Sequence, residues 1–270
     1  MTEQILTYRD ETLNLDRAYY YALLVEVATD AFSYAITYRD KLMACQNNCT
    51  LEELTEPLRL QDILSAHYKK IVIALPSAGF TLIPNSLFSN DHLQQIGHLL
   101  DVQENERLIA KPFDTENYIV FKVDKQLIEG LRKYGLQNIF FKPTGWVKAL
   151  TQATPQNNQL FLNVDGGKLD IAYFENSRLR FYNCFDYFNT DDILYYTVTV
   201  AKELALVPAE LSVIISGPLT TEDIVYASLY DFFGEVKINV SAPVELPGQI
   251  MPQQVLSLVS LSLCESSEVY

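Results

Sequence analysis

The apolar and polar positions between residues 160 and 185 predict three short strands joined by two tight turns. Residues 160–164 and 169–174 are apolar runs, and Gly166-Gly167-Lys168 predicts the turn between them. After a second predicted turn at residues 175–177, residues 179–185 alternate between apolar and polar side chains. The segment therefore predicts an antiparallel three-stranded unit.

A segment near the N-terminus has the same outline. Residues 24–36 predict a strand, a turn and a strand, and a turn at residues 38–41 leads into a third run at residues 42–45. Three pairs of residues hold equivalent places in the two segments: Glu26 and Asn163, Ala35 and Ala172, and Leu42 and Leu179. Each pair has the same offset, since 163 − 26 = 172 − 35 = 179 − 42 = 137. A constant offset without gaps indicates a duplicated domain.

The remaining pattern predicts further strands and helices. Strands are expected over residues 18–27 (beginning at Tyr19-Tyr20-Tyr21), 71–75, 80–83, 108–113, 118–123, 139–141, 211–215 and 236–240. Helices are expected over residues 51–56 (capped by Thr50), 60–67, 91–100, 125–134 (capped by Asp124), 144–153, 190–206 (capped by Asn189 or Thr190), 220–233 and 252–264. This order favours an α/β protein in which each of two domains has a mixed sheet flanked by helices.

The polar segment 154–158, which contains one proline, is the expected linker. It predicts a first domain over residues 1–155, with an inserted subdomain around residues 50–125, and a second domain over residues 156–270. The final helix of the second domain is expected to pack back on the first.

Composition narrows the class of protein. The chain has 270 residues, of which 49% are hydrophobic and 20% charged, which is typical of a globular protein. Its net charge of −14 repels phosphate backbones and argues against nucleic-acid binding. Neither a secretion signal nor an apolar run of about 20 residues is recognisable, so a cytoplasmic protein without membrane insertion is expected.

The four cysteines are expected to be reduced thiols. Cys45 and Cys49 have the spacing of a metal-binding pair, but neither a second pair nor a nearby histidine completes a site. We therefore expect ordinary thiols and no bound metal.

Residues 163–174 (NVDGGKLDIAYF) resemble, without gaps, the second phosphate motif D-I-G-G-G-T-T-D-I-A-V-F of the actin-like ATPase superfamily. Residues 26–35 occupy the frame of the first phosphate motif, and residues 213–218 correspond to the adenosine motif. Within the superfamily, the chain resembles the bacterial division and pilus proteins FtsA and PilM, and an uncharacterised bacterial family with this fold. The resemblance implies a duplicated actin-like ATPase (ribonuclease H-like) fold.

The resemblance also implies a nucleotide site, for which ATP with Mg²⁺ is the expected ligand if binding is retained. The residues that it assigns to the phosphates are Glu26, Thr29, Asn163, Gly166, Gly167 and Lys168, and it places Gly217 near the adenine. A structural interpretation exists for several of them. Any tight hairpin needs Gly166 and Gly167, and a lysine at a turn is ordinarily solvated.

The sequence departs from all three motifs. Asn163 replaces an aspartate and cannot neutralise a cation, while Glu26 replaces the other aspartate with a longer side chain. Ala28 replaces a glycine, at a cost of about 1–2 kcal/mol if the position requires a positive φ. Asp165 would repel a phosphate charge ~4 Å away by about 4 kcal/mol at an effective dielectric constant near 20. Pro218 removes an N–H group beside the expected base.

Two functions from different classes remain. The first is a non-catalytic binding or scaffold protein, without catalytic or metal-binding residues and without a cofactor, that uses the fold to bind a protein partner. The alternative is an ATP-binding protein or slow ATPase of the FtsA or PilM type. An acidic cluster for a two-metal nuclease is disfavoured because the chain lacks a basic path for nucleic acid.

Overall fold

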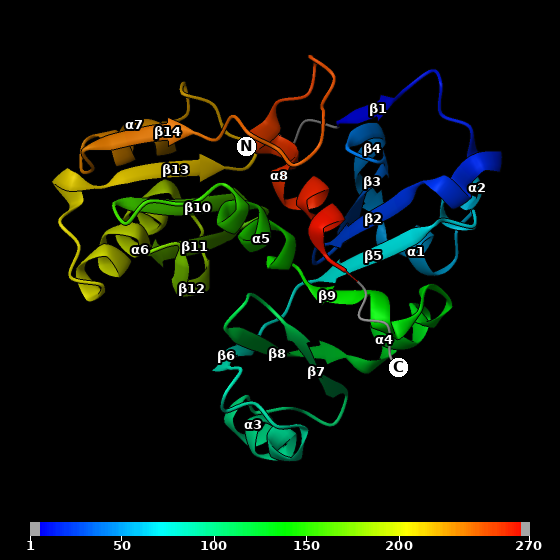
Figure 1. Ribbon diagram of the computed structural model, residues 1–270, viewed down its shortest axis with the longest axis horizontal. Helices are drawn as coiled ribbons and strands as arrows, with labels where there is room; N and C mark the ends of the chain where they lie inside the picture. Colours follow the sequence, from blue (N-terminus) through cyan, green and yellow to red (C-terminus); the bar gives the residue numbers. More distant parts are fainter. Residues whose placement is uncertain (1–5, 266–270) are drawn as a thin grey trace. The chain divides into compact units, whose positions relative to one another are not determined.

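The computed structural model describes residues 6–265 and divides into two compact units (Figure 1). Of the described residues, 6–145 and 261–265 form the first unit, and 146–260 form the second unit. The domain limits expected from the linker stay a prediction. Among the described residues, no helix is long and apolar enough to cross a membrane.

The first unit is built on a six-stranded sheet with the strand order β1-β4-β3-β2-β5-β9. Its strands are β1 (Thr7–Arg9), β2 (Ala22–Val27), β3 (Ala31–Tyr38), β4 (Lys41–Thr50), β5 (Lys70–Leu75) and β9 (Ile139–Phe141). Strands β2, β3 and β4 are antiparallel neighbours, whereas β5 and β9 continue the sheet in parallel. The sequence pattern predicted these strands except β1, whose three residues are too few for a periodicity signal.

A three-stranded antiparallel sheet is inserted between β5 and β9. Its order is β6-β8-β7, formed by β6 (Phe80–Pro84), β7 (Glu106–Pro112) and β8 (Asn117–Asp124). The Phe141 ring of β9 lies 4.9 Å from the ring of Phe80 and 5.3 Å from that of Phe121, between ring centroids. These aromatic contacts join the inserted sheet to the end of β9.

Short helices complete the first unit. They are η1 (Leu15–Tyr20), α1 (Leu51–Thr55), α2 (Gln61–Leu64), η2 (Asn90–His92), α3 (Leu93–Leu99), α4 (Lys125–Gly130), η3 (Arg132–Tyr134) and η4 (Leu136–Asn138). Asp124 caps α4 as predicted, because its carboxylate accepts hydrogen bonds from the N–H groups of Gln126 and Leu127. Thr50 occupies the N-cap position of α1 as predicted, although its side chain makes no capping hydrogen bond.

The tyrosine cluster was wrongly predicted to begin a strand. Residues Leu15–Tyr20 form the 3₁₀ helix η1, and β2 begins only at Ala22. The Asn14 side chain accepts a hydrogen bond from the N–H of Asp16 and starts this turn, which outweighs the strand propensity of the tyrosines. Tyr19 and Tyr20 are consequently 55% and 53% exposed.

The second unit is built on a five-stranded sheet with the order β12-β11-β10-β13-β14. Its strands are β10 (Gln159–Asp165), β11 (Lys168–Glu175), β12 (Arg178–Asp186), β13 (Ser212–Ser216) and β14 (Glu235–Ile238). Its helical segments are α6 (Thr190–Glu203), η5 (Pro208–Glu210), α7 (Ile224–Tyr230) and α8 (Pro252–Ser260). The predicted strands are confirmed, and Asn189 caps α6 in a capping box with Asp192.

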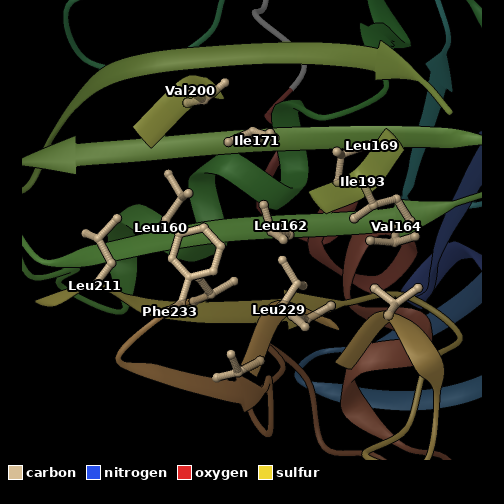
Figure 2. Packing of buried hydrophobic residues seen from close by; sticks show 14 of the residues in the cluster. Leu160, Leu162, Val164, Leu169, Ile171, Ile193, Val200, Leu211, Leu229 and Phe233 are labelled. Carbon is tan, nitrogen blue, oxygen red and sulfur yellow. The ribbon is translucent and has the colours of Figure 1, made fainter. Parts of the chain in front are cut away.

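Helices α6 and α7 bury one face of this sheet. Figure 2 shows Leu160, Leu162 and Val164 of β10 in one cluster with residues of both helices, including Ile193, Val200 and Leu229. Helix α7 is shorter than the predicted 220–233 because the Asp223 carboxylate accepts hydrogen bonds from the N–H and hydroxyl of Thr220, which holds residues 220–223 in a turn.

The hairpins β2–β3 and β10–β11 have the same strand register, offset by 137 residues. Leu24 faces Ala35 in the first unit, and Phe161 faces Ala172 in the second. The register shift between Ile36 and Thr37 in the pairing of β3 with β4 recurs between Tyr173 and Phe174 in the pairing of β11 with β12, at the same offset. The predicted duplication is therefore confirmed down to a shared β-bulge.

Two segments lead from one unit to the other. Helix α5 (Thr144–Gln152) begins in the first unit and continues in the second. The predicted helix 252–264 is divided into α8, in the second unit, and the 3₁₀ helix η6 (Leu261–Leu263), in the first. The Lys70 ammonium donates a hydrogen bond of 2.7 Å to the Ser262 carbonyl, which ties η6 to β5.

Candidate functional site

The hairpin between β10 and β11 turns on two glycines in the left-handed conformation. Gly166 has φ = 53° and Gly167 has φ = 77°, and they connect the paired residues Asp165 and Lys168. Two consecutive positive φ angles match the tight turn that favours the twist of a hairpin. A Cβ atom at Gly166 would meet nothing within 4 Å, so this glycine is required by backbone conformation and faces open space.

The predicted phosphate contact Lys168 has a partner within its own sheet. Its ammonium lies 2.5 Å from the Asp186 carboxylate on β12, directly opposite in the strand register. The side chains are 40% and 68% exposed, so the pair is solvated and contributes little to stability. Lys168 thus lies at the turn, and a role in contacting phosphates stays a prediction.

Asn163 lies in a buried network on three strands. Its amide donates a hydrogen bond of 3.1 Å to the Asp170 carboxylate, which also accepts one of 2.8 Å from the Tyr182 hydroxyl. All three residues are buried. Burial, with the nearby Asp170 charge as a smaller cause, raises the pKa of Tyr182 well above its ordinary value, so the phenol stays a donor. Tyr182 was not identified from the sequence.

The equivalent hairpin between β2 and β3 has a different turn. The N–H of Ala28 bonds the Ala31 carbonyl at 2.8 Å, and Thr29 and Asp30 lie exposed between them. None of these four residues has a positive φ. The steric cost considered for Ala28 therefore does not arise, because this turn needs no left-handed residue. Thr29 is brought to the turn as predicted, but no glycine shares it.

Glu26, at the carboxyl end of β2, forms an ion pair with Lys142. The Lys142 ammonium lies 3.1 Å from Oε1 of Glu26, and the side chains are 15% and 9% exposed. Lys142 is the first residue after β9, and its N–H bonds the Leu75 carbonyl at the end of β5. The ion pair thus sits where three parallel strands end, the edge at which ligands bind in many α/β proteins.

Sequence reasoning missed Lys142. The available signal was its position directly after the apolar run Ile139–Phe141. A charged residue that follows a fully buried strand needs a partner or solvent, and here the partner is a site residue.

The segment after β13 is held by its own chain. Gly217 has φ = 119°, and a Cβ there would lie 2.0 Å from the Val164 carbonyl oxygen. The N–H of Gly217 donates to the Gln253 carbonyl at 2.8 Å, and the Gln253 amide donates to the Leu219 carbonyl at 3.3 Å. Close backbone packing therefore explains why residue 217 is a glycine. The next residue, Pro218, is exposed. Gln253 was not identified from the sequence.

Within residues 6–265, no group of three or more histidine, cysteine, aspartate or glutamate side chains is arranged to hold a metal ion. None of the four cysteines forms a disulfide bond, which agrees with the predicted reduced thiols. Burial raises the pKa of Cys45 and of Cys49 to about 11, so neither is a reactive thiolate at neutral pH.

Comparison with known proteins identifies the fold. The model of the family described as "Protein of unknown function (DUF3822)" matches residues 10–236. No curated protein matches the chain. The chain is similar to a solved Bacteroides thetaiotaomicron VPI-5482 protein with an actin-like ATPase fold and unknown function, with a TM-score of 0.77 and 22% identity over 94% of this chain and 100% of that one.

A second solved structure has the same fold. It is a chain of the PilM–PilN type IV pilus biogenesis complex, with a TM-score of 0.58 and 14% identity over 90% of this chain and 96% of that one. The two likenesses establish an actin-like ATPase fold, as the motif resemblance implied.

Proposed function

We propose that this chain, which belongs to the DUF3822 family, is a non-catalytic binding or scaffold protein that uses an actin-like body as a platform for a protein partner. The observation that carries the proposal is the ion pair of Glu26 with Lys142. In active proteins of this fold, the carboxylate in the place of Glu26 helps to hold Mg²⁺ and its water. Here a lysine of the same chain supplies positive charge to that carboxylate.

The attraction between Glu26 and Lys142 opposes the binding of a metal ion at Glu26. Two unit charges 3.1 Å apart attract by about 5 kcal/mol at an effective dielectric constant of 20. A divalent cation that bound Glu26 would have to displace the Lys142 ammonium or tolerate a like charge beside it. Either event costs free energy that an unmodified aspartate site would not require.

The second unit supports the same proposal. Asn163 carries no charge, and its amide is already bound to Asp170. The Lys168 ammonium faces Asp186, and Gly217 is packed against Val164 and held by Gln253. Asn163, Lys168 and Gly217 thus each have an internal partner or a structural role.

One observation favours ATP binding as the second candidate function. Gly166 and Gly167 keep the left-handed turn whose backbone N–H groups can cradle an anion, and the space beside Gly166 is open. In this alternative, Glu26, Thr29, Asn163 and the turn residues would lie near the phosphates, and Gly217 near the adenine.

Thermal melting with millimolar ATP and Mg²⁺ distinguishes the two functions. A ligand at 100 times its dissociation constant stabilises a protein by about 2.7 kcal/mol, which gives a readily measured shift. We expect no shift beyond that produced by Mg²⁺ alone. A saturable shift that disappears when Gly166 is replaced by valine would support the ATP-binding function instead.

The partner requires a separate test. The solved PilM–PilN complex has a chain of this fold in an assembly with another protein, which makes a partner a reasonable expectation here. Affinity capture of the tagged chain from its native cells, with quantitative mass spectrometry, should enrich the same protein reproducibly. Failure to enrich any protein over a tag-only control would count against the scaffold function.

A further inference from the structure

Helices α6 and α7 begin at the same edge of the second unit's sheet. Strands β12 and β13 point in the same direction, since β12 and β10 are both antiparallel to β11 and β10 is parallel to β13. Helix α6 follows β12 and α7 follows β13, and the two helices pack against each other over one face of the sheet. Their first turns therefore lie close together at the carboxyl ends of these strands.

The outer side of these helix starts is apolar. Phe188, Asp191 and Tyr195 recur at intervals of three and four residues, on the side of α6 opposite the buried Ile193. Phe188 is 93% exposed, Tyr195 is 64% exposed, and Ile224, the first residue of α7, is 74% exposed. Single exposed apolar side chains are ordinary, but several around neighbouring helix starts are typical of an interaction surface. Phe188, Tyr195 and Ile224 are called the α6–α7 patch below.

The capping box of α6 fixes the backbone of Phe188. An apolar residue directly before the cap Asn189 commonly packs against the fourth helical residue, which is Ile193 in α6. Ile193 lies in the core, and Phe188 stays exposed. The Asp192 carboxylate accepts hydrogen bonds from the N–H of Phe188 at 2.8 Å and from that of Asn189 at 3.2 Å. An exposed aromatic ring on a fixed backbone loses little conformational entropy on binding, which favours a role as an interface anchor.

Carboxylates surround the α6–α7 patch. Asp191 lies in the first turn of α6, and Glu222 lies two residues before α7. Both side chains are exposed, and within residues 6–265 neither forms an ion pair. The Lys168 ammonium is paired with Asp186, and the one lysine of α6, Lys202, lies in its last turn. The surface around the patch is therefore acidic.

This charge selects among possible occupants. A second copy of the chain with its net charge of −14, a nucleic acid and an anionic membrane surface would each be repelled. Residues 1–5 and 266–270 contain two glutamates and no lysine or arginine, so these segments do not supply the complementary side chains. A protein segment that carries lysine or arginine beside an apolar stripe complements both the carboxylates and the exposed apolar side chains.

We propose that the α6–α7 patch binds a basic amphipathic helix of a partner protein, an inference that rests on the proposed scaffold function and gives its partner a chemistry. Phe188 and Tyr195 are separated by about two helical turns, which matches the spacing of apolar side chains along one face of a bound helix. Lysine or arginine side chains beside that stripe face Asp191 and Glu222.

Fluorescence anisotropy with a defined probe tests the surface. The probe is a labelled leucine–lysine peptide of about 18 residues whose leucines lie on one face of a helix. We expect the wild-type chain to bind this peptide and Phe188→Ala to weaken binding by roughly tenfold, as for an anchor residue. A peptide of the same composition with its leucines distributed around the helix should bind at least about tenfold more weakly. Tyr20→Ala, at a tyrosine 53% exposed in the first unit, is the matched control and should bind like the wild-type chain.

Charge reversal distinguishes docking at the patch from a general attraction of a basic peptide to an acidic chain. Asp191→Lys/Glu222→Lys should weaken binding of the leucine–lysine peptide by roughly tenfold or more. The same variant should bind a leucine–glutamate peptide that the wild-type chain does not bind. Glu52→Lys/Asp62→Lys changes the net charge equally, at exposed carboxylates in the first turns of α1 and α2, and should leave both affinities near those of the wild-type chain.

Three results would overturn the proposal: no binding of the leucine–lysine peptide to the wild-type chain, equal binding of the two leucine–lysine peptides, or effects of the patch variants no larger than those of the controls. Circular dichroism establishes that each variant is folded. Affinity capture from native cells separates this proposal from the scaffold function. A protein that the wild-type chain enriches and Phe188→Ala/Asp191→Lys loses supports the site. Equal enrichment by both chains would refute the site and leave the scaffold function standing, whereas enrichment of no protein counts against the scaffold function itself.

Discussion

Removal of the Lys142 ammonium should destabilise the first unit strongly. In Lys142→Met, the Glu26 carboxylate stays largely buried and loses the cation that lies 3.1 Å from it. Breaking a buried pair by removing one partner typically costs about 3–5 kcal/mol, because the remaining charge is left without compensation. The same reasoning applies to Glu26→Gln, which leaves the lysine.

The double variant Glu26→Gln/Lys142→Met distinguishes the interaction between the two charges from the contacts that each side chain makes with its surroundings. Because both charges are absent, its loss of stability should be smaller than the sum of the single losses by at least about 2 kcal/mol. The assay is urea unfolding followed by circular dichroism. Fluorescence of Trp146, the only tryptophan and a residue of the second unit, shows in parallel whether that unit unfolds separately.

A matched exposed pair provides the control. Arg132 and Glu129 form an ion pair of 2.9 Å in the same unit, with side chains 64% and 63% exposed. Arg132→Met should cost at most about 0.5 kcal/mol, since solvent screens the charges. The reasoning is refuted if Lys142→Met costs no more than this control, or if the two single losses add without coupling. Lys142→Met should also gain stability from millimolar Mg²⁺, which the wild-type chain should not.

Three further predictions follow from local geometry. Gly217→Ala should destabilise the second unit by more than about 3 kcal/mol in urea unfolding, because the new Cβ would overlap the Val164 carbonyl. Gly166→Ala should cost only about 1–2 kcal/mol, because the Cβ would lie in open space and only the positive φ is unfavourable. Equal losses for the two variants would contradict this reasoning. Asn189→Ala should cost about 1 kcal/mol by the same measurement, and no loss would show that the capping box contributes nothing. Burial raises the pKa of the Cys45 thiol from 9.0 to about 11, so between these pH values the folded chain keeps the proton and the unfolded chain loses it. The contribution of this thiol to the free energy of unfolding should therefore be constant below pH 9 and fall by at most about 2–3 kcal/mol between pH 9 and 11. Cys45→Ala should remove this part of the pH dependence.

Local patterns and the internal repeat made much of the fold predictable from the sequence. The turn at Gly166-Gly167 and the alternation along β12 are patterns of a few neighbouring residues. The offset of 137 then predicted the equivalent strands in the first copy. Contacts between distant segments were not predictable in this way. No spacing rule joins Lys142 to Glu26, because their approach depends on how β5 and β9 extend the sheet. The 3₁₀ turn at Tyr19 was missed because a single hydrogen bond from the Asp16 N–H to the Asn14 side chain outweighed residue propensity.

The equivalent residues Glu26 and Asn163 have different internal partners in the two copies, and this difference bears on the proposed function. A carboxylate at this position in either copy would need a cation or a hydrogen-bond donor as compensation whenever no ligand is bound. In this chain the first copy keeps the charge at Glu26 and adds Lys142, whereas the second has a neutral Asn163 that donates to Asp170. Each position is thereby stable without a ligand, and ligand binding would have to break an existing contact in each copy. Selection for such self-sufficiency is expected where the fold serves as a surface, and not where it must bind and release a nucleotide.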